Sequence, residues 1–233
     1  MIAYPKDWKK IGQDISIREL DEVLFEILSG INCNCLAFSG GLDSSLLLHY
    51  LVQIHKGVEA FTIGLSMNHP DIYNSRIFSK RFKTVNHRII MPTEKYLLKS
   101  RRDKFEGDTA VKLFYKFVSN HTDKIVSGDG IDEFMCGYYA HQENPSEKVY
   151  YDILRKLQKE QLVPLNKNSG KVKVFLPYLD ERLISLMSQI PIIEKVDRIG
   201  RKNLVYQLAE NKLPYSILTR RKYGFCDAFK VKE

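Results

Sequence analysis

The sequence contains no run of 18 apolar residues, and therefore nothing in it predicts a membrane-spanning helix. Its opening stretch, MIAYPKDWKK, has no apolar core of the kind that a secretion signal needs, which favours a cytoplasmic protein. Cysteine is scarce, with four residues, and the only close pair, Cys33 and Cys35, fits no common zinc-binding spacing. We expect the cysteines to be reduced and mostly buried, as is usual in the cytoplasm.

Acidic residues are outnumbered by basic ones, 28 against 36, and the net charge is +8. The basic side chains gather in the stretches SKRFKTVNHR, KSRRDKF and TRRKYGF. No signature of an RNA-binding module accompanies them. We therefore interpret these stretches as solvated surface, with contact to nucleic acid as the less favoured alternative.

Strand-like and helix-like segments alternate over roughly the first 145 residues. This alternation predicts an α/β fold with a parallel, doubly wound sheet. Three helical patterns follow, and the strand signal fades. We expect a single domain, residues 1–233, in which an α/β part (1–145) is completed by a mainly helical part (146–233). The segments expected to form strands are 33–38, 58–65, 87–91 and 124–128, and those expected to form helices in the first part are 16–28, 44–56, 71–82, 93–101 and 108–121.

The stretch CLAFSGGLDSSLLLHYL, residues 35–51, places a polar loop between a predicted strand and a predicted helix. Gly40 and Gly41 allow a tight turn, and the start of the next helix offers free N–H groups that suit a phosphate. Asp43 would repel a phosphate unless Mg²⁺ lay between them. The motifs GxxxxGK[ST] and GxGxxG are both absent, which excludes the two commonest phosphate loops. The stretch therefore predicts a different nucleotide triphosphate site, with an acid that holds a metal.

A second stretch, IVSGDGIDEFMCGYY at residues 125–139, also runs from a strand into a glycine turn. The carboxyl ends of parallel strands share one edge of a sheet, and ligands bind there. We expect Asp129, Asp132 and Glu133 to bring negative charge towards the metal and phosphates held by the first loop.

The loop SGGLDSS resembles that of the ATP pyrophosphatases, the PP-loop superfamily, which cleave ATP between its α- and β-phosphates and adenylate a substrate oxygen. The second stretch resembles the SGEGADE…GGY signature of the asparagine synthetases within that superfamily. Two more segments resemble theirs in the same order, namely VFLPYLDERLISLMSQIP (174–191) and KNLVYQLAENKLPYSILTRRKYGF (202–225). Four segments in the right order are far more specific than one.

The resemblance implies a site for ATP and Mg²⁺. Asp43 and Asp132 match the two acids that hold Mg²⁺, and Lys222 matches a lysine that neutralises charge on the phosphates. Asp129 stands where many members have Glu, at the position of a base for the incoming amine. Asp180 we interpret as the cap of the helix that follows it. The residues implied in binding ATP and its pyrophosphate part are Leu36, Ser39, Gly40, Gly41, Asp43, Ser44, Ile63, Ser127 and Gly128.

The resemblance also implies a reaction. A carboxylate, by default that of aspartate, would be adenylated with release of pyrophosphate, and ammonia or another amine would then give the amide and AMP. The glutaminase domain of the family begins with a cysteine after the initiator methionine, whereas residue 2 here is Ile2. We therefore expect free ammonium, or a separate glutaminase subunit, to supply the nitrogen.

Two alternatives stay open, a tRNA-modifying ATP pyrophosphatase and a nucleotide-binding regulatory subunit. The basic stretches and the Cys33/Cys35 pair are the features that a tRNA-modifying enzyme would use. A homo-oligomer is compatible with the sequence, which does not determine the oligomeric state.

Overall fold

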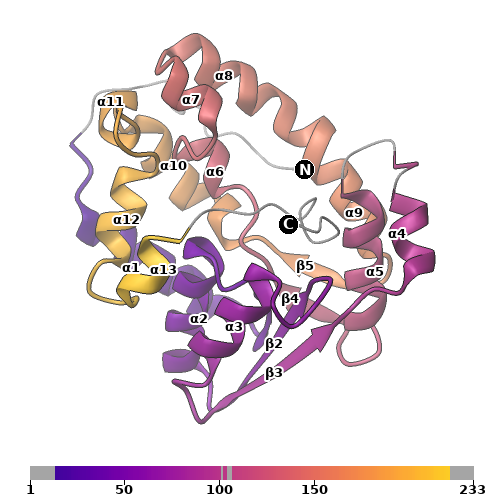
Figure 1. Ribbon diagram of the computed structural model, residues 1–233. Helices are drawn as coiled ribbons and strands as arrows, with labels where there is room; N and C mark the ends of the chain where they lie inside the picture. Colours follow the sequence, from indigo (N-terminus) through magenta and orange to yellow (C-terminus); the bar gives the residue numbers. More distant parts are fainter. Residues whose placement is uncertain (1–13, 101, 104–106, 221–233) are drawn as a thin grey trace.

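The computed structural model describes residues 14–100, 102–103 and 107–220 (Figure 1). Within these residues, five strands form one sheet in the order β3-β2-β1-β4-β5, and every neighbouring pair is parallel. The predicted parallel sheet is thus confirmed, and its first four strands lie in the predicted segments or begin within two residues of them. The strands are β1 (Cys35–Ala37), β2 (Val58–Ile63), β3 (Val85–Ile90), β4 (Lys124–Val126) and β5 (Lys173–Phe175).

Helices lie on both faces of the sheet, as expected for a doubly wound fold. Figure 1 shows α2 and α3 on one side of the strands, and α4, α5 and α9 on the other. The helices are α1 (Ile17–Gly30), α2 (Leu42–Ile54), α3 (Pro70–Ser79), α4 (Glu94–Ser100), α5 (Asp108–Val118), α6 (Ile131–Phe134), α7 (Tyr139–Glu143), α8 (Glu147–Lys156), the π-helical turn η1 (Leu157–Leu162), α9 (Val163–Ser169), the 3₁₀ turn η2 (Pro177–Leu179), α10 (Glu181–Gln189), α11 (Ile192–Lys195), α12 (Asn203–Ala209) and α13 (Tyr215–Leu218).

Strand β5 was not predicted. It belongs to the part of the chain in which we expected helices, yet it extends the sheet by pairing with β4, with Val174 opposite Ile125. A strand of three residues is too short to show an alternating pattern in the sequence. The sheet therefore includes residues from both sides of the division that we placed at about residue 145. That division itself remains a prediction.

Helix α1 illustrates how local sequence sets an element and its packing. The hydroxyl of Ser16 accepts a hydrogen bond from the Glu19 amide (3.2 Å), and the Glu19 carboxylate accepts one from the Ser16 amide (2.9 Å). This reciprocal cap satisfies N–H groups that have no partner at a helix start. Leu20, Leu24 and Leu28 recur along one face and are buried in the core.

None of the helices in the described part of the chain combines the length and the apolar composition that crossing a bilayer would require.

The order of the strands creates a crevice. From β1 the chain moves outward through β2 to β3, and it then returns to the opposite side of β1 as β4. The connections that leave β1 and β4 consequently diverge, and ligands of doubly wound folds bind where they do so. The two stretches singled out in the sequence, residues 39–45 and 127–133, follow these two strands.

Candidate active site

A cavity of about 560 Å³ lies at this switch point, within the usual size range of small-molecule sites. Its walls come from both predicted loops, from the end of β2, and from residues near position 200. Leu36 and Gly40, although predicted to bind ATP, are not among the lining residues. Leu36 is buried within β1. The other predicted residues within the described part of the chain all line the cavity, namely Ser39, Gly41, Asp43, Ser44, Ile63, Ser127, Gly128, Asp129 and Asp132.

The first loop turns sharply onto the start of α2. Gly40 adopts a φ of +66°, and a Cβ atom there would lie 2.4 Å from the Ser75 backbone nitrogen in α3, so that a glycine is required. The Ser39 and Ser44 hydroxyls lie 3.2 Å apart. No side chain caps the start of α2, at Gly41, which leaves the first N–H groups of the helix for a ligand. The loop thus has the backbone geometry of an anion site.

The second loop presents its acids at the opposite wall. Ser127 donates a hydrogen bond to Asp129 (2.6 Å), and the turn that follows uses Gly130 at a φ of +99°. Asp132 lies in α6, directly after this turn. Asp180 lies outside the cavity lining, and its carboxylate accepts a hydrogen bond from the Arg182 amide (3.0 Å), which confirms it as the cap of α10.

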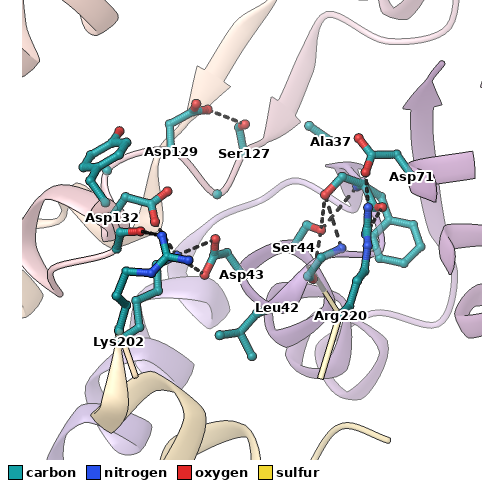
Figure 2. Close-up of a pocket in the computed structure, with 18 of the residues that line it drawn as sticks. Ala37, Leu42, Asp43, Ser44, Asp71, Ser127, Asp129, Asp132, Lys202 and Arg220 are labelled. Atoms are coloured by element: carbon teal, nitrogen blue, oxygen red, sulfur yellow. Dashed lines mark hydrogen bonds and ion pairs between the residues drawn. The ribbon is translucent and has the colours of Figure 1, made fainter. Parts of the chain in front are cut away.

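Lys202 joins the two loops (Figure 2). Its Nζ lies 2.7 and 2.8 Å from the two carboxylate oxygens of Asp43, and 2.6 Å from Oδ1 of Asp132. Only 5% of the lysine side chain is exposed. Burial alone would lower the pKa of Lys202, but the charges of Asp132 and Asp43 outweigh it and raise that pKa above its ordinary value. The two acids that the sequence predicted to share one cation therefore converge on one cationic group.

Sequence reasoning did not single out Lys202. It precedes α12 with a φ of +57°, which is unusual for a residue other than glycine, and no motif marks that conformation. Gly137 leaves the space that this arrangement needs, because a Cβ atom there would lie 1.9 Å from Oδ1 of Asp132. The contact with Asp43 spans 159 residues and is visible only in the folded chain.

Arg220 brings the end of the described chain to the first loop. Its Nη1 donates to the Ser39 carbonyl oxygen (2.8 Å), and its Nη2 forms an ion pair with Asp71, as Figure 2 shows. The predicted phosphate-neutralising residue, Lys222, lies outside the described residues. Arg220, two positions before Lys222, contacts the first loop.

Glu133, Tyr138 and Gln161 also line the cavity, on the side of α6. Oε1 of Glu133 accepts hydrogen bonds from the Tyr138 hydroxyl and from the Gln161 side-chain amide (2.5 Å). Burial, and then the charge of Asp132, raise the pKa of the Glu133 carboxyl. The sequence predicted Glu133 near the site, but nothing in it indicated Gln161, which lies in the π-helical turn η1.

The sequence model of a family described as asparagine synthase matches residues 34–174 and 167–232 of the chain, which is most of its length. The chain belongs to the asparagine synthase family. A search of curated protein sequences found no match.

Solved structures resemble this member of the asparagine synthase family at low sequence identity. An NMN synthetase from Francisella tularensis aligns with a TM-score of 0.53 and 14% identity, over 91% of this chain and 78% of that one. An NH₃-dependent NAD synthetase from Campylobacter jejuni, solved with a nitrate ion, aligns with a TM-score of 0.42 and 13% identity, over 66% of this chain and 78% of that one. The first of these supports the fold.

Proposed function

We propose that the chain is an ATP-dependent amide-forming synthetase. It adenylates a carboxylate, by default that of aspartate, and releases pyrophosphate. Ammonia or another amine then displaces AMP to give the amide. The observation that carries this proposal is the convergence of Asp43 and Asp132 on one cation position, between an uncapped helix start and a cavity of ligand size. Membership of the asparagine synthase family supports the same reaction class.

In this proposal the first loop binds the β- and γ-phosphates. The free N–H groups at the start of α2 and the hydroxyls of Ser39 and Ser44 donate hydrogen bonds to the phosphate oxygens. The ends of β1 and β2, with Ala37, Phe38 and Ile63 in the cavity wall, form the adenosine side.

The residues present fit a Mg²⁺ ion. Asp43 and Asp132 supply carboxylate oxygens, which Mg²⁺ prefers, and they already surround one cationic atom at 2.6–2.8 Å. The ion would offset the negative charge of the phosphates. Asp43 and Asp132 would hold the ion in the place that the Lys202 ammonium group now occupies, and Lys202 would then be available to contact the pyrophosphate.

The second step needs a proton acceptor for the incoming amine. Asp129 lines the cavity on the wall opposite the first loop, and we propose it as that base. Lys222 is proposed to neutralise the charge that builds on the phosphates during adenylation, since Arg220 anchors the segment leading to it. Free ammonium, or a glutaminase subunit docked at the cavity mouth, would deliver the nitrogen.

Exchange of labelled pyrophosphate into ATP, measured with a panel of carboxylates, tests the proposal. Exchange that depends on one carboxylate is expected, and chromatography after full turnover should show AMP rather than ADP. ADP as the main product, or ATP turnover that no carboxylate stimulates, would contradict it. A tRNA-modifying enzyme would instead respond to tRNA, although Cys33 and Cys35 are buried and neither lines the cavity.

A further inference from the structure

One carboxylate in the cavity wall is only half satisfied. Glu133 is 1% exposed, and its two side-chain donors, Tyr138 and Gln161, contact the same oxygen, Oε1. Gln161 also donates to the Tyr138 hydroxyl (3.0 Å), which fixes the two donors relative to each other. The second oxygen, Oε2, is buried without a hydrogen-bond partner in the described part of the chain.

A buried acceptor without a partner is costly, and the cost is greatest for a charged group. Such an atom calls for a physical explanation, and a ligand bound in the cavity provides one. Burial and the charge of Asp132 disfavour the ionised form of Glu133, and a positively charged donor at Oε2 would stabilise that form.

The local backbone supports a ligand site at this point. Gln161 reaches Glu133 from the π-helical turn η1, which interrupts the run from α8 into α9. Turns of this type are rare and occur frequently at functional sites. Glu133 follows Asp132 in α6, and the charge of Asp132 acts on the Glu133 carboxyl.

We propose that Glu133, held by Tyr138 and Gln161, binds a primary ammonium group in the cavity. The proposal rests on the proposed synthetase function and names a chemical requirement of its substrates. Two sources share this chemistry, the amino group of an amino-acid substrate and the ammonium ion that supplies the nitrogen. In either case, the positive charge and N–H donors of the ligand complete the hydrogen bonding of Oε2.

Matched substrates separate the two sources. Pyrophosphate exchange is measured with pairs that differ only in an amino group, such as aspartate and succinate or glutamate and glutarate. If the substrate amino group binds here, the amino member of the active pair is preferred, and Glu133→Gln reduces that preference by about ten- to a hundredfold, the range expected for a lost charge-assisted hydrogen bond. If ammonium binds here, exchange is unchanged and the KM for ammonium rises by a similar factor.

Two further variants guard against a purely structural effect. Glu143→Gln makes the same change at an exposed residue of α7 that does not line the cavity, and both substrate preference and the KM for ammonium should match the wild type. Tyr138→Phe removes one donor to Oε1 but keeps the carboxylate, so its effect should be smaller than that of Glu133→Gln. Thermal melts of all three variants show whether each one is folded.

Direct binding keeps this inference separate from the proposed reaction. Saturation-transfer NMR with methylammonium chloride as the probe, in the absence of ATP, should give a signal for the wild type that Glu133→Gln loses and Glu143→Gln keeps. Loss of that signal in folded Glu133→Gln would support the ammonium site even if no carboxylate were activated. Unchanged methylammonium binding, together with unchanged substrate preference and ammonium KM, would overturn it.

Discussion

The two walls of the cavity are built in different ways. The wall that contains the first loop is local, because Ser39, Gly41 and Ser44 lie within one loop and the start of one helix. The opposite wall is assembled from distant segments, with Asp132 from α6, Gln161 from η1 and Lys202 from the start of α12. A wall built from neighbouring residues can be recognised in the sequence as a motif. A wall built from distant segments can be recognised only in part.

The largest effect is expected where the two walls meet. Asp43→Ala should reduce Mg²⁺-dependent pyrophosphate release by about a thousandfold. The variant lacks one of the two acids proposed to hold the ion, and the ion offsets the charge of the phosphates. Asp132→Ala should behave alike, which would show that both walls serve one ion. Stopped-time assays of pyrophosphate measure this, with Asp152→Ala, a half-exposed residue of α8, as the control. Full activity in folded Asp43→Ala would remove its metal role.

A substitution of Asp129 should affect one reaction step and not the other. Asp129→Asn should slow amide formation by about a hundredfold, since a base for the amine acts only after adenylation. Pyrophosphate exchange should change little, because the first loop, which we propose to bind the phosphates, is unaltered. Parallel assays of exchange and amide product decide the matter. Equal losses in both would assign Asp129 to ATP binding or to folding instead.

A substitution of Lys202 would show whether the carboxylates of the two walls repel each other when no cation lies between them. Lys202→Met leaves the Asp43 and Asp132 carboxylates without their shared cation, and we expect the free energy of unfolding to fall by about 3 kcal/mol. Millimolar Mg²⁺ should restore part of this loss in the variant, since it binds the folded state only. Urea unfolding with and without Mg²⁺ measures both effects. Lys212→Met, which breaks an ion pair with Asp21 outside the cavity, should show no such rescue by Mg²⁺.

The smallest effect concerns strands β2 and β3, beside the cavity. Burial, and then the charge of Arg76, lower the pKa of His87 to about 4, and its Nε2 lies 2.7 Å from the Thr62 hydroxyl. Between pH 6.5 and pH 4, the His87 side chain binds a proton in the unfolded chain but not in the folded one. The neutral histidine therefore contributes fully to the free energy of unfolding above pH 6.5, and this contribution is lost as the pH falls towards 4. The loss should reach about 2 kcal/mol at pH 5.

His87→Gln provides the comparison for this pH effect. Glutamine does not titrate, so urea unfolding of the variant should show a smaller decline in stability between pH 7 and pH 5 than that of the wild type. A decline of the same size in both proteins would assign the acid sensitivity to other groups.

Part of this molecule could be predicted from its sequence because the signals were local. The SGGLDSS loop, the parallel sheet and the capping role of Asp180 each depend on neighbouring residues or on repeated patterns. Strand β5 was missed because three residues carry no period, and η1 because a π-helical turn has no sequence pattern of its own. Leu36 was placed in the cavity wall by analogy, whereas its side chain lies in the core.

Lys202, although it begins the family-like segment 202–225, was not linked to Asp43 by that resemblance, and Gln161 belongs to no motif. Their partners, Asp43 and Glu133, lie 159 and 28 residues away along the chain. Each contact exists because several elements pack at once, and single-sequence patterns do not record such packing. Lys222 is a different case, since it lies outside the described residues and its role remains a prediction.

The pairing of Lys202 with Asp43 also has a consequence for the order of folding. Contacts between residues far apart along the chain carry a large loop-closure entropy, and they form late. Until Lys202 arrives, Asp43 and Asp132 face each other without a cation, and this repulsion opposes closure of the two loops. We therefore expect refolding from urea to be faster in the presence of Mg²⁺, because the ion would offset the repulsion between the two acids before Lys202 reaches them.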